Sequence, residues 1–225
     1  MILQALTLTL RLAVIVSAIL LILGLPIAHW LAFSRGRGRF LVEALVSLPI
    51  VLPPTVLGFY VLIAIGPLSP IGRWYHSLTG HGLAFTFEGL VIGSVLYSLP
   101  FAVQPMSASF VSVDRKLLDA SALLGASRWR TFWRVVLPLG MPGILTGVVL
   151  SFAHTLGEFG VVLMIGGNIP GATQTVSILI YDQVQALDYA AANRTALVLL
   201  LLCFALLASL HALRRTRGWG IGELR

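Results

Sequence analysis

Long apolar runs, separated by short polar or basic connections, fill almost the whole chain. Five runs stand out, at residues 12–33, 44–65, 89–111, 139–165 and 195–213. Each is near or above the ~20 residues that a helix needs to cross the hydrocarbon core of a bilayer. Lipid offers no partners to backbone groups, so spanning helices are predicted, and the alternating ~10-residue strands of a barrel are not seen. We therefore expect an all-α integral membrane protein with about five spanning helices, in which residues 1–225 form one transmembrane domain.

Composition leads to the same class of protein. Of the 225 residues, 58% are hydrophobic and 10% are charged, with a mean hydropathy of +0.96, whereas a soluble domain carries about 25% charged residues. The net charge of +7 would suggest nucleic-acid binding in a soluble protein. In so apolar a chain, basic residues that flank membrane spans explain the charge, and we expect no nucleic-acid partner.

Most basic residues lie in three of the connections. Twelve of the 15 follow the first run, separate the third from the fourth, or follow the fifth, and five spans would place these connections on one side. The positive-inside rule makes that side the cytoplasm, with the N-terminus outside and the C-terminus inside. The twelve are Arg35, Arg37, Arg39, Arg115, Lys116, Arg128, Arg130, Arg134, Arg214, Arg215, Arg217 and Arg225.

Two connections are expected outside. Residues 66–88 hold Gly, Pro, Ser and two His, and predict a loop with a short interfacial helix. Residues 166–192 begin with a turn and continue with a short apolar-faced helix over 175–187. Asp188 can then cap the helix that leads into the last span.

The connection over residues 112–138 predicts two short amphipathic helices joined at a glycine turn. Asp114 opens the first helix and Gly125 ends it, Ser127 caps the second, and Pro138 suits the first turn of the fourth span. Trp129, Phe132 and Trp133 share one face of the second helix. Such an element suits a groove on a partner protein, while an ordinary interfacial helix with aromatics among the headgroups is the alternative.

The spacing within this connection resembles the EAA motif of ABC importer permeases, which reads Glu-Ala-Ala, three residues, Gly, nine residues, Ile-x-Leu-Pro. Here the corresponding residues are Asp119-Ala-Ser, Gly125 and Val135-Val-Leu-Pro, with mild departures at Asp119, Ser121 and Val135. The resemblance implies a type I importer permease whose coupling helix docks on a cytoplasmic ATPase. The residues it assigns to this coupling are Asp119, Ala120, Ser121, Gly125, Ala126, Leu137 and Pro138.

The same resemblance implies the partners. They are two copies of an ABC ATPase that uses ATP-Mg, a second permease copy in a homodimer, and an external oxyanion-binding protein; related sulfate systems tend to pair two different permeases. The ATPase must be another chain, because Lys116 is the only lysine and follows Arg115, which excludes a Gly-Lys-Ser/Thr phosphate loop. We expect no catalytic residue, cofactor or metal site in this chain.

Three stretches resemble the sulfate and molybdate branch of these permeases. Gly157-Glu-Phe-Gly in the fourth run resembles the signature of that branch, and Asn168-Ile-Pro-Gly-Ala-Thr-Gln-Thr resembles the outer loop of molybdate permeases. Pro49-Ile-Val-Leu-Pro-Pro resembles their second span. The cargo implied is an oxyanion, molybdate first, with sulfate, thiosulfate or tungstate as alternatives.

The polar residues inside the runs are candidates for a gate or a path. Glu158 and His154, four residues apart on one helix face, form either a gating pair or a pair that only packs helices. The second and third runs contain no Lys or Arg, so we expect a weak path lined by hydroxyls and backbone amides, with helix packing as the alternative for each hydroxyl. The hydroxyl candidates are Ser94, Ser98, Ser107, Thr146 and Ser151.

Prolines are predicted to kink the second and third spans, which would let these helices swing between two packings. These prolines are Pro49, Pro53, Pro54, Pro100 and Pro105.

Two other classes of protein remain to be weighed. An integral membrane enzyme would need a catalytic constellation, but the five histidines show no His-Glu-x-x-His spacing and no Gly-x-Ser-x-Gly elbow occurs. A stand-alone channel or secondary transporter would need no ATPase, and the coupling-type segment argues against it.

Overall fold

The computed structural model describes residues 2–34 and 36–216, and these residues form helices and loops with no strand. Arg35, Arg217 and Arg225 lie outside the described residues, as do the side chains of Arg214 and Arg215. The elements are α1 (Ile2–Phe33), α2 (Arg39–Val51), α3 (Pro54–Ile65), α4 (Pro70–Thr79), α5 (Phe87–Val111), α6 (Arg115–Leu123), α7 (Arg128–Thr131), the π-helix η1 (Phe132–Val136), α8 (Leu137–Leu139), α9 (Met141–Gly157), α10 (Gly160–Gly166), α11 (Val176–Gln185) and α12 (Tyr189–Thr216).

Three of the predicted spans are continuous helices. α1, α5 and the 189–209 part of α12 are each long and apolar enough to cross a bilayer. α1 begins well before residue 12, so Arg11 lies inside it, and its guanidinium sits 4.6 Å from the centre of the Phe87 ring. Pro100 and Pro105 lie within the uninterrupted α5, and the kink expected at these prolines stays a prediction.

The second and fourth predicted spans are broken helices, and the five spans expected are reached when each bent pair counts as one span. α2 and α3 meet at 115°, and the break falls at Leu52 and Pro53, as the prolines predicted. The segment Arg128–Leu139 meets Met141–Gly157 at 68°, and the bend falls at Gly140. Pro138 therefore lies before this bend and not in the first turn of α9. The apolar run up to residue 165 is also broken, because α9 ends at Gly157 and α10 turns aside.

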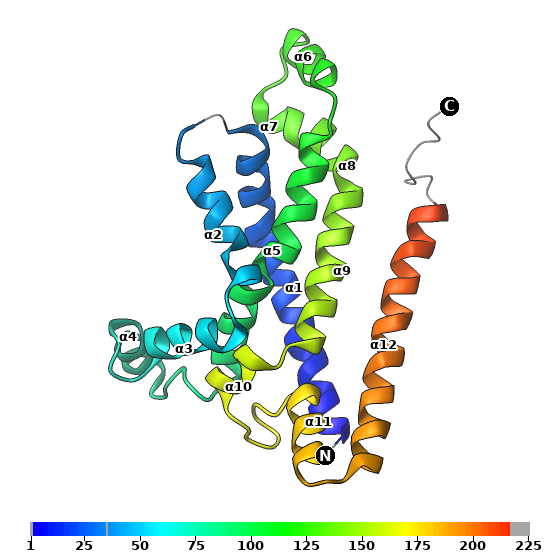
Figure 1. Cartoon of the computed structure of the whole chain (residues 1–225). Coiled ribbons are helices and arrows are strands. Elements are labelled where there is room, and N and C mark those ends of the chain that lie inside the picture. Colours follow the sequence, from blue (N-terminus) through cyan, green and yellow to red (C-terminus); the bar gives the residue numbers. More distant parts are fainter. Residues whose placement is uncertain (1, 35, 217–225) are drawn as a thin grey trace.

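α1, α5 and α9 form the central bundle, with α12 standing at its edge (Figure 1). The side chains fully buried in the bundle include Leu12 and Leu20 of α1 and Val103, Met106 and Phe110 of α5. Only 11% of the apolar window of α12 is buried. Its exposed leucines are therefore stabilised by lipid and not by the core of this chain.

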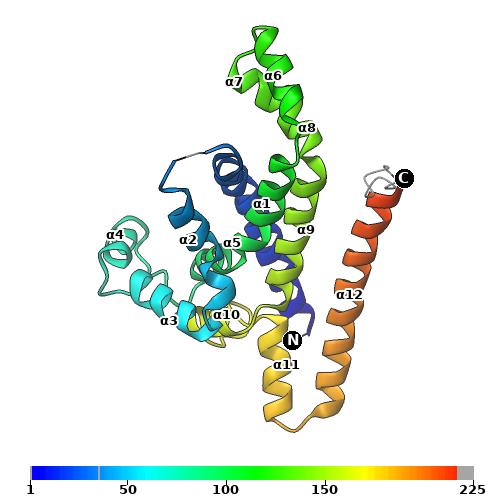
Figure 2. The same ribbon diagram turned by 45° about the horizontal axis from the view of Figure 1, so that its top comes forward.

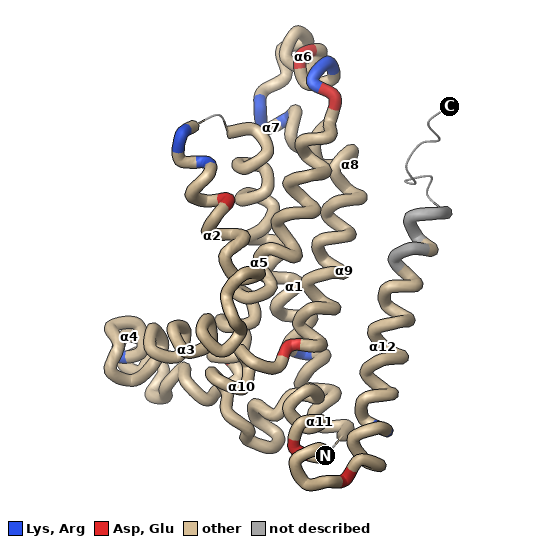
Figure 3. The backbone as a smooth tube through the Cα atoms, in the orientation of Figure 1, with Lys and Arg blue, Asp and Glu red and all other residues tan. Residues whose placement is uncertain are grey.

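The two ends of the bundle differ in charge. α6 projects from one end, where the C-terminal end of α12 also lies, while the N-terminus and α11 lie at the other end (Figures 1 and 2). The basic residues after α1 and in α6 and α7 gather at the α6 end (Figure 3). The loop predictions are confirmed by α4 within residues 66–88 and by α11, after which Asp188 Oδ1 accepts a hydrogen bond from Ala191 N.

Glycines let α9 approach α5 closely. A Cβ atom on Gly143 would lie 2.2 Å from Ser109 Cβ and 2.4 Å from Pro105 O, and one on Gly147 would lie 2.6 Å from Ala102 O. Backbone oxygens cannot move aside as a flexible side chain can. Small residues four apart are a common way to bring membrane helices together.

We expect Gly143→Ala to destabilise the protein by about 1–3 kcal/mol, because the new methyl overpacks the α5–α9 contact. Gly157→Ala is the matched control on the same helix, since nothing lies within 4 Å of its added Cβ. Thermal unfolding in detergent, followed by circular dichroism, compares the two variants. Equal melting temperatures would show that α5 and α9 are not held at this distance.

Candidate coupling surface and polar core

The α6–α7 segment (residues 112–138) begins with a helix whose two ends are both closed by hydrogen bonds. Asp114 Oδ1 accepts from Lys116 N at 2.9 Å. At the other end, Gly125 N donates to Ala122 O and Ala126 N donates to Ser121 O, which is the Schellman pattern. Gly125 has a φ of +74°, the left-handed region that glycine adopts without steric cost.

The second half of the segment is fixed to the first through two hydroxyl groups. Ser127 Oγ accepts from Arg130 N at the start of α7, as predicted. Ser121 Oγ lies 2.8 Å from Thr131 Oγ1, and this hydrogen bond joins α6 to α7. Thr131 was not predicted, because two hydroxyls ten positions apart carry no periodic signal. After α7 the chain continues through η1, where the rings of Trp129, Phe132 and Trp133 contact one another.

The tip of this segment is open to solvent. No residue of α6 is buried, and Leu123 and Leu124 are 89% and 87% exposed. Leucines so exposed on a projecting charged element are typical of a protein interface. The predicted coupling residues Asp119, Ala120, Ser121, Gly125 and Ala126 gather at this tip, whereas Leu137 and Pro138 lie in α8 at its base (Figure 1).

A polar cluster joins α5 to α9 inside the bundle. Ser98 Oγ lies 2.9 Å from His154 Nδ1 and 3.1 Å from Thr155 Oγ1. The His154 ring stacks on Phe101 with ring centres 3.9 Å apart. Thr155 was not predicted, although it lies next to His154 and close to the Gly-Glu-Phe-Gly signature.

Glu158 follows the end of α9 and is 3% exposed. The expected pair with His154 is not formed, since no hydrogen bond or ion pair joins them in the part of the chain that the structure describes. Ser94 is the polar side chain beside the carboxyl group, but neither carboxyl oxygen has a hydrogen bond of good geometry within the described residues, and nor has Ser94 Oγ. A buried polar group without partners is costly, which makes this position unusual in the bundle.

Two of the other path candidates are bonded to their own helix. Thr146 Oγ1 donates to Pro142 O at 2.6 Å, and Ser151 Oγ donates to Val148 O at 3.0 Å. In this conformation these two hydroxyls satisfy backbone groups within packed helices. Ser151 is fully buried and Ser107 is half-buried.

The loop between α10 and α11 is held rigidly. Asn168 Nδ2 donates to Asp182 Oδ2 at 2.7 Å, and Gln174 Nε2 donates to both Asn168 Oδ1 and Asp182 Oδ2. Thr9 Oγ1 on α1 accepts a hydrogen bond from Val176 N, which fixes the start of α11. The residues singled out by the sequence as an outer-loop motif thus form one hydrogen-bonded unit at the N-terminal end of the molecule.

The chain matches known proteins over nearly its whole length. A family described as "Binding-protein-dependent transport system inner membrane component" matches residues 21–217. The chain is 50% identical to the molybdenum transport system permease protein ModB of Azotobacter vinelandii, over 95% of this chain and 94% of that protein. It is 34% identical to a probable sulfate transport system permease protein, cysT, of Chlorokybus atmophyticus, over 84% of this chain and 65% of that protein.

The fold also has solved counterparts. An inward-facing structure of the MetNI methionine ABC transporter superposes with a TM-score of 0.73 over 95% of this chain and 94% of that one, at 16% sequence identity. The arrangement of helices is therefore that of a type I ABC importer transmembrane domain. Together with the family match, this means that the chain belongs to the inner membrane components of binding-protein-dependent transport systems.

Proposed function

We propose that this chain is the permease subunit of an ATP-driven importer that moves molybdate into the cytoplasm. The observation that carries the proposal is the 50% identity to a molybdenum permease across 95% of the chain. The outer-loop unit of Asn168, Gln174 and Asp182 supports it, because it includes part of the motif that resembles molybdate permeases. Sulfate, thiosulfate or tungstate carried by the same machinery is the alternative. The 34% identity to a probable sulfate permease is the reason to include sulfate as a competitor in the uptake assay.

The partners follow from this role. A separate ABC ATPase, in two copies and using ATP-Mg, would contact the exposed tip around Leu123, Leu124 and Gly125. A second copy of this permease would complete a homodimer, and an external oxyanion-binding protein would deliver the ion. This chain itself would bind no cofactor or metal and would catalyse no reaction.

The α6–α7 segment is built to transmit force. The Schellman turn at Gly125 and the Ser121–Thr131 hydrogen bond make its two short helices one rigid body. That body continues through η1 and α8 to the bend at Gly140, where α9 begins. Movement of the ATPase at the tip would therefore turn α9 against α5, which opens or closes the path.

The path itself is proposed to be weakly binding. No Lys or Arg occurs in the second and third runs, so no cation holds the oxyanion there. Conduction favours sites weak enough to release the ion, and specificity would come from the external protein. An ionised Glu158 would repel a dianion, so its role, like that of His154, is in gating or positioning at the α9–α10 break. Ser94, Ser98, Thr146 and Ser151 are the hydroxyls proposed to line the path when the bundle opens.

Uptake by the assembled complex tests the proposal. We expect labelled molybdate to enter liposomes only with ATP and the binding protein, and excess sulfate to compete poorly. Uptake without ATP would favour a channel or secondary transporter, and equal competition by sulfate would favour the alternative cargo.

Gly125→Val tests the coupling role in the same assay. A β-branched residue at φ +74° costs about 1–2 kcal/mol, so we expect roughly a tenfold loss of uptake with insertion unchanged. Gly125→Asn should keep most uptake, because Asn tolerates this backbone region. Gly38→Val is the control: Gly38 also has free space but a φ of −78°. Normal uptake by Gly125→Val would remove the coupling argument.

Glu158→Met separates stability from transport. Removing a buried carboxyl group that has no hydrogen-bond partner among the described residues should stabilise the protein by about 1–3 kcal/mol, while uptake should fall. Thr155→Val is the control and should lower stability, because it removes the hydrogen bonds to Ser98 and Ser151. A lower melting temperature for Glu158→Met would mean that the carboxyl group is satisfied in the assembled complex.

Labelling of single cysteines tests the orientation. We propose that the α6 end and the C-terminus face the cytoplasm and that the N-terminus lies outside. In a Cys203→Ser background, Ile169→Cys should react with an impermeant maleimide added outside intact cells. Leu124→Cys, at an 87% exposed position, should react only after permeabilisation. The reverse pattern would contradict the orientation.

A further inference from the structure

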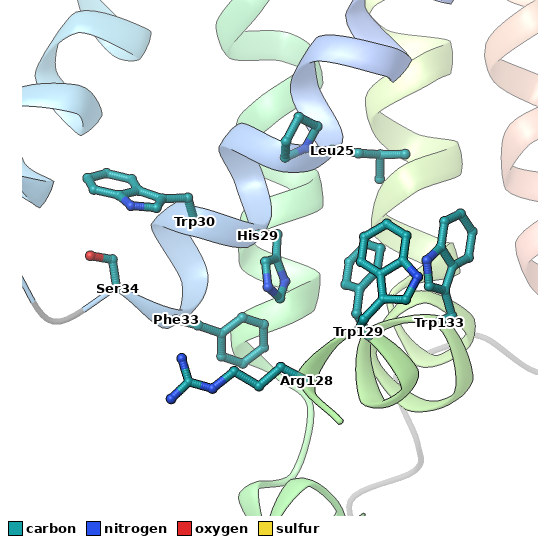
Figure 4. Close-up of a pocket in the computed structure, with 10 residues that line it drawn as sticks. Leu25, His29, Trp30, Phe33, Ser34, Arg128, Trp129 and Trp133 are labelled. Atoms are coloured by element: carbon teal, nitrogen blue, oxygen red, sulfur yellow. The ribbon is translucent and has the colours of Figure 1, made fainter. Parts of the chain in front are cut away.

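A cavity of about 670 Å³ lies between the end of α1 and the junction of α7 with η1 (Figure 4). Trp30 and Phe33 line it from α1, and Trp129 and Trp133 line it from the other side. Three of the five tryptophans of the chain therefore meet at this one place. The cavity is separate from the exposed tip of α6 and from the Ser98–His154 cluster, so the proposed transport function leaves it unexplained.

The depth of the cavity matches the edge of a bilayer. α1 has 32 residues, or about 48 Å at the rise of an α-helix, and the hydrocarbon core is ~30 Å thick. Its final turns, which carry Trp30 and Phe33, therefore reach the headgroup region. Tryptophan is the residue most suited to that region, where one side is apolar and the other wet.

One charged side chain reaches the cavity and lacks a partner. Arg128 lines it and makes no ion pair with any carboxylate among the described residues. His29 also lines it, but its Nδ1 atom is buried and out of reach of a ligand. An arginine with unused donors at the edge of an aromatic cavity fits a phosphate group. A small inorganic oxyanion alone would leave the aromatic walls unfilled.

An apolar stripe leads from the bilayer into the cavity. Ile22, Pro26, Trp30 and Phe33 recur at helical spacing along α1, and all four are exposed. This stripe gives an acyl chain a continuous surface that ends beside Arg128. The occupant that satisfies both the stripe and the cation is an amphiphile with an anionic head.

We propose that the cavity binds an anionic phospholipid of the leaflet on the α6 side. Its phosphate contacts Arg128, and one acyl chain lies against Trp30, Trp129 and Trp133. The lipid then bridges α1 and α7, so its charge influences how firmly the α6–α7 segment is held against α1. This site does not depend on which ion the protein carries.

Brominated lipids test the proposal, because bromine quenches tryptophan fluorescence only at short range. The complete complex is placed in nanodiscs of fixed phosphatidylglycerol and phosphatidylcholine content, with bromine on one lipid or on the other. Subtracting the signal of Trp129→Phe/Trp133→Phe isolates the contributions of Trp129 and Trp133, two of the three cavity tryptophans. We expect bromine on phosphatidylglycerol to quench them more strongly, by about fivefold per lipid, as one arginine near the membrane surface predicts.

Arg128→Gln should abolish this preference, whereas Arg130→Gln should retain it, since Arg130 lies on the same helix but does not line the cavity. Equal quenching by both lipids in the unmodified protein would overturn the proposal. It would also fail if Arg128→Gln kept the preference, or if neither lipid quenched, because a protein partner would then cover the cavity.

Discussion

A bilayer cannot hydrogen-bond a backbone N–H or C=O group, and this constraint decides where the helices of this chain can break. α2 ends at Val51 and α9 ends at Gly157, and both breaks lie in segments that the apolar pattern predicts as spans. The halves that follow, α3 and α10, pack on each other. A Cβ on Gly160 would lie 2.7 Å from Pro54 Cβ, and one on Gly58 would lie 2.8 Å from Met164 Cβ. Each break is therefore shielded from lipid by the other. Pro53 and Pro54 have no backbone N–H group, so fewer hydrogen-bond donors are left without a partner at the first break.

This pairing divides the molecule into parts with different freedom. α1, α5 and α9 share one buried core and glycine-mediated contacts in this conformation. α3 and α10 belong to a second, smaller cluster around Val61, Ile165 and Val161. The tip of the α6–α7 segment lies outside both cores, whereas its base joins the first core through Val136. A permease needs this division, because packed helices can shift against one another only when force reaches them from a part that projects beyond the core.

The sequence was most informative where structure depends on neighbours along the chain. Asp114, Gly125, Ser127 and Asp188 end or begin helices as predicted, because a cap is decided within a few residues. The bends at Gly140 and Glu158 were not predicted, since they depend on helices packing across the fold. Proline was a partial guide: Pro53 and Pro54 mark a break, but Pro100 and Pro105 are accommodated in α5. For the same reason, His154 pairs with Ser98 on another helix and not with Glu158 on its own.

The π-helix at Phe132–Val136 has a mechanical consequence. A π turn holds about one residue more than an α turn, and such bulges often occur at functional sites. If η1 relaxed to α geometry, α7, which directly precedes it, would advance by one residue, which is a screw motion of about 100° and 1.5 Å relative to α9. The chain thus carries one additional residue at the junction between the α6–α7 tip and the bundle, and a change in winding there would reorient the tip without breaking a covalent bond.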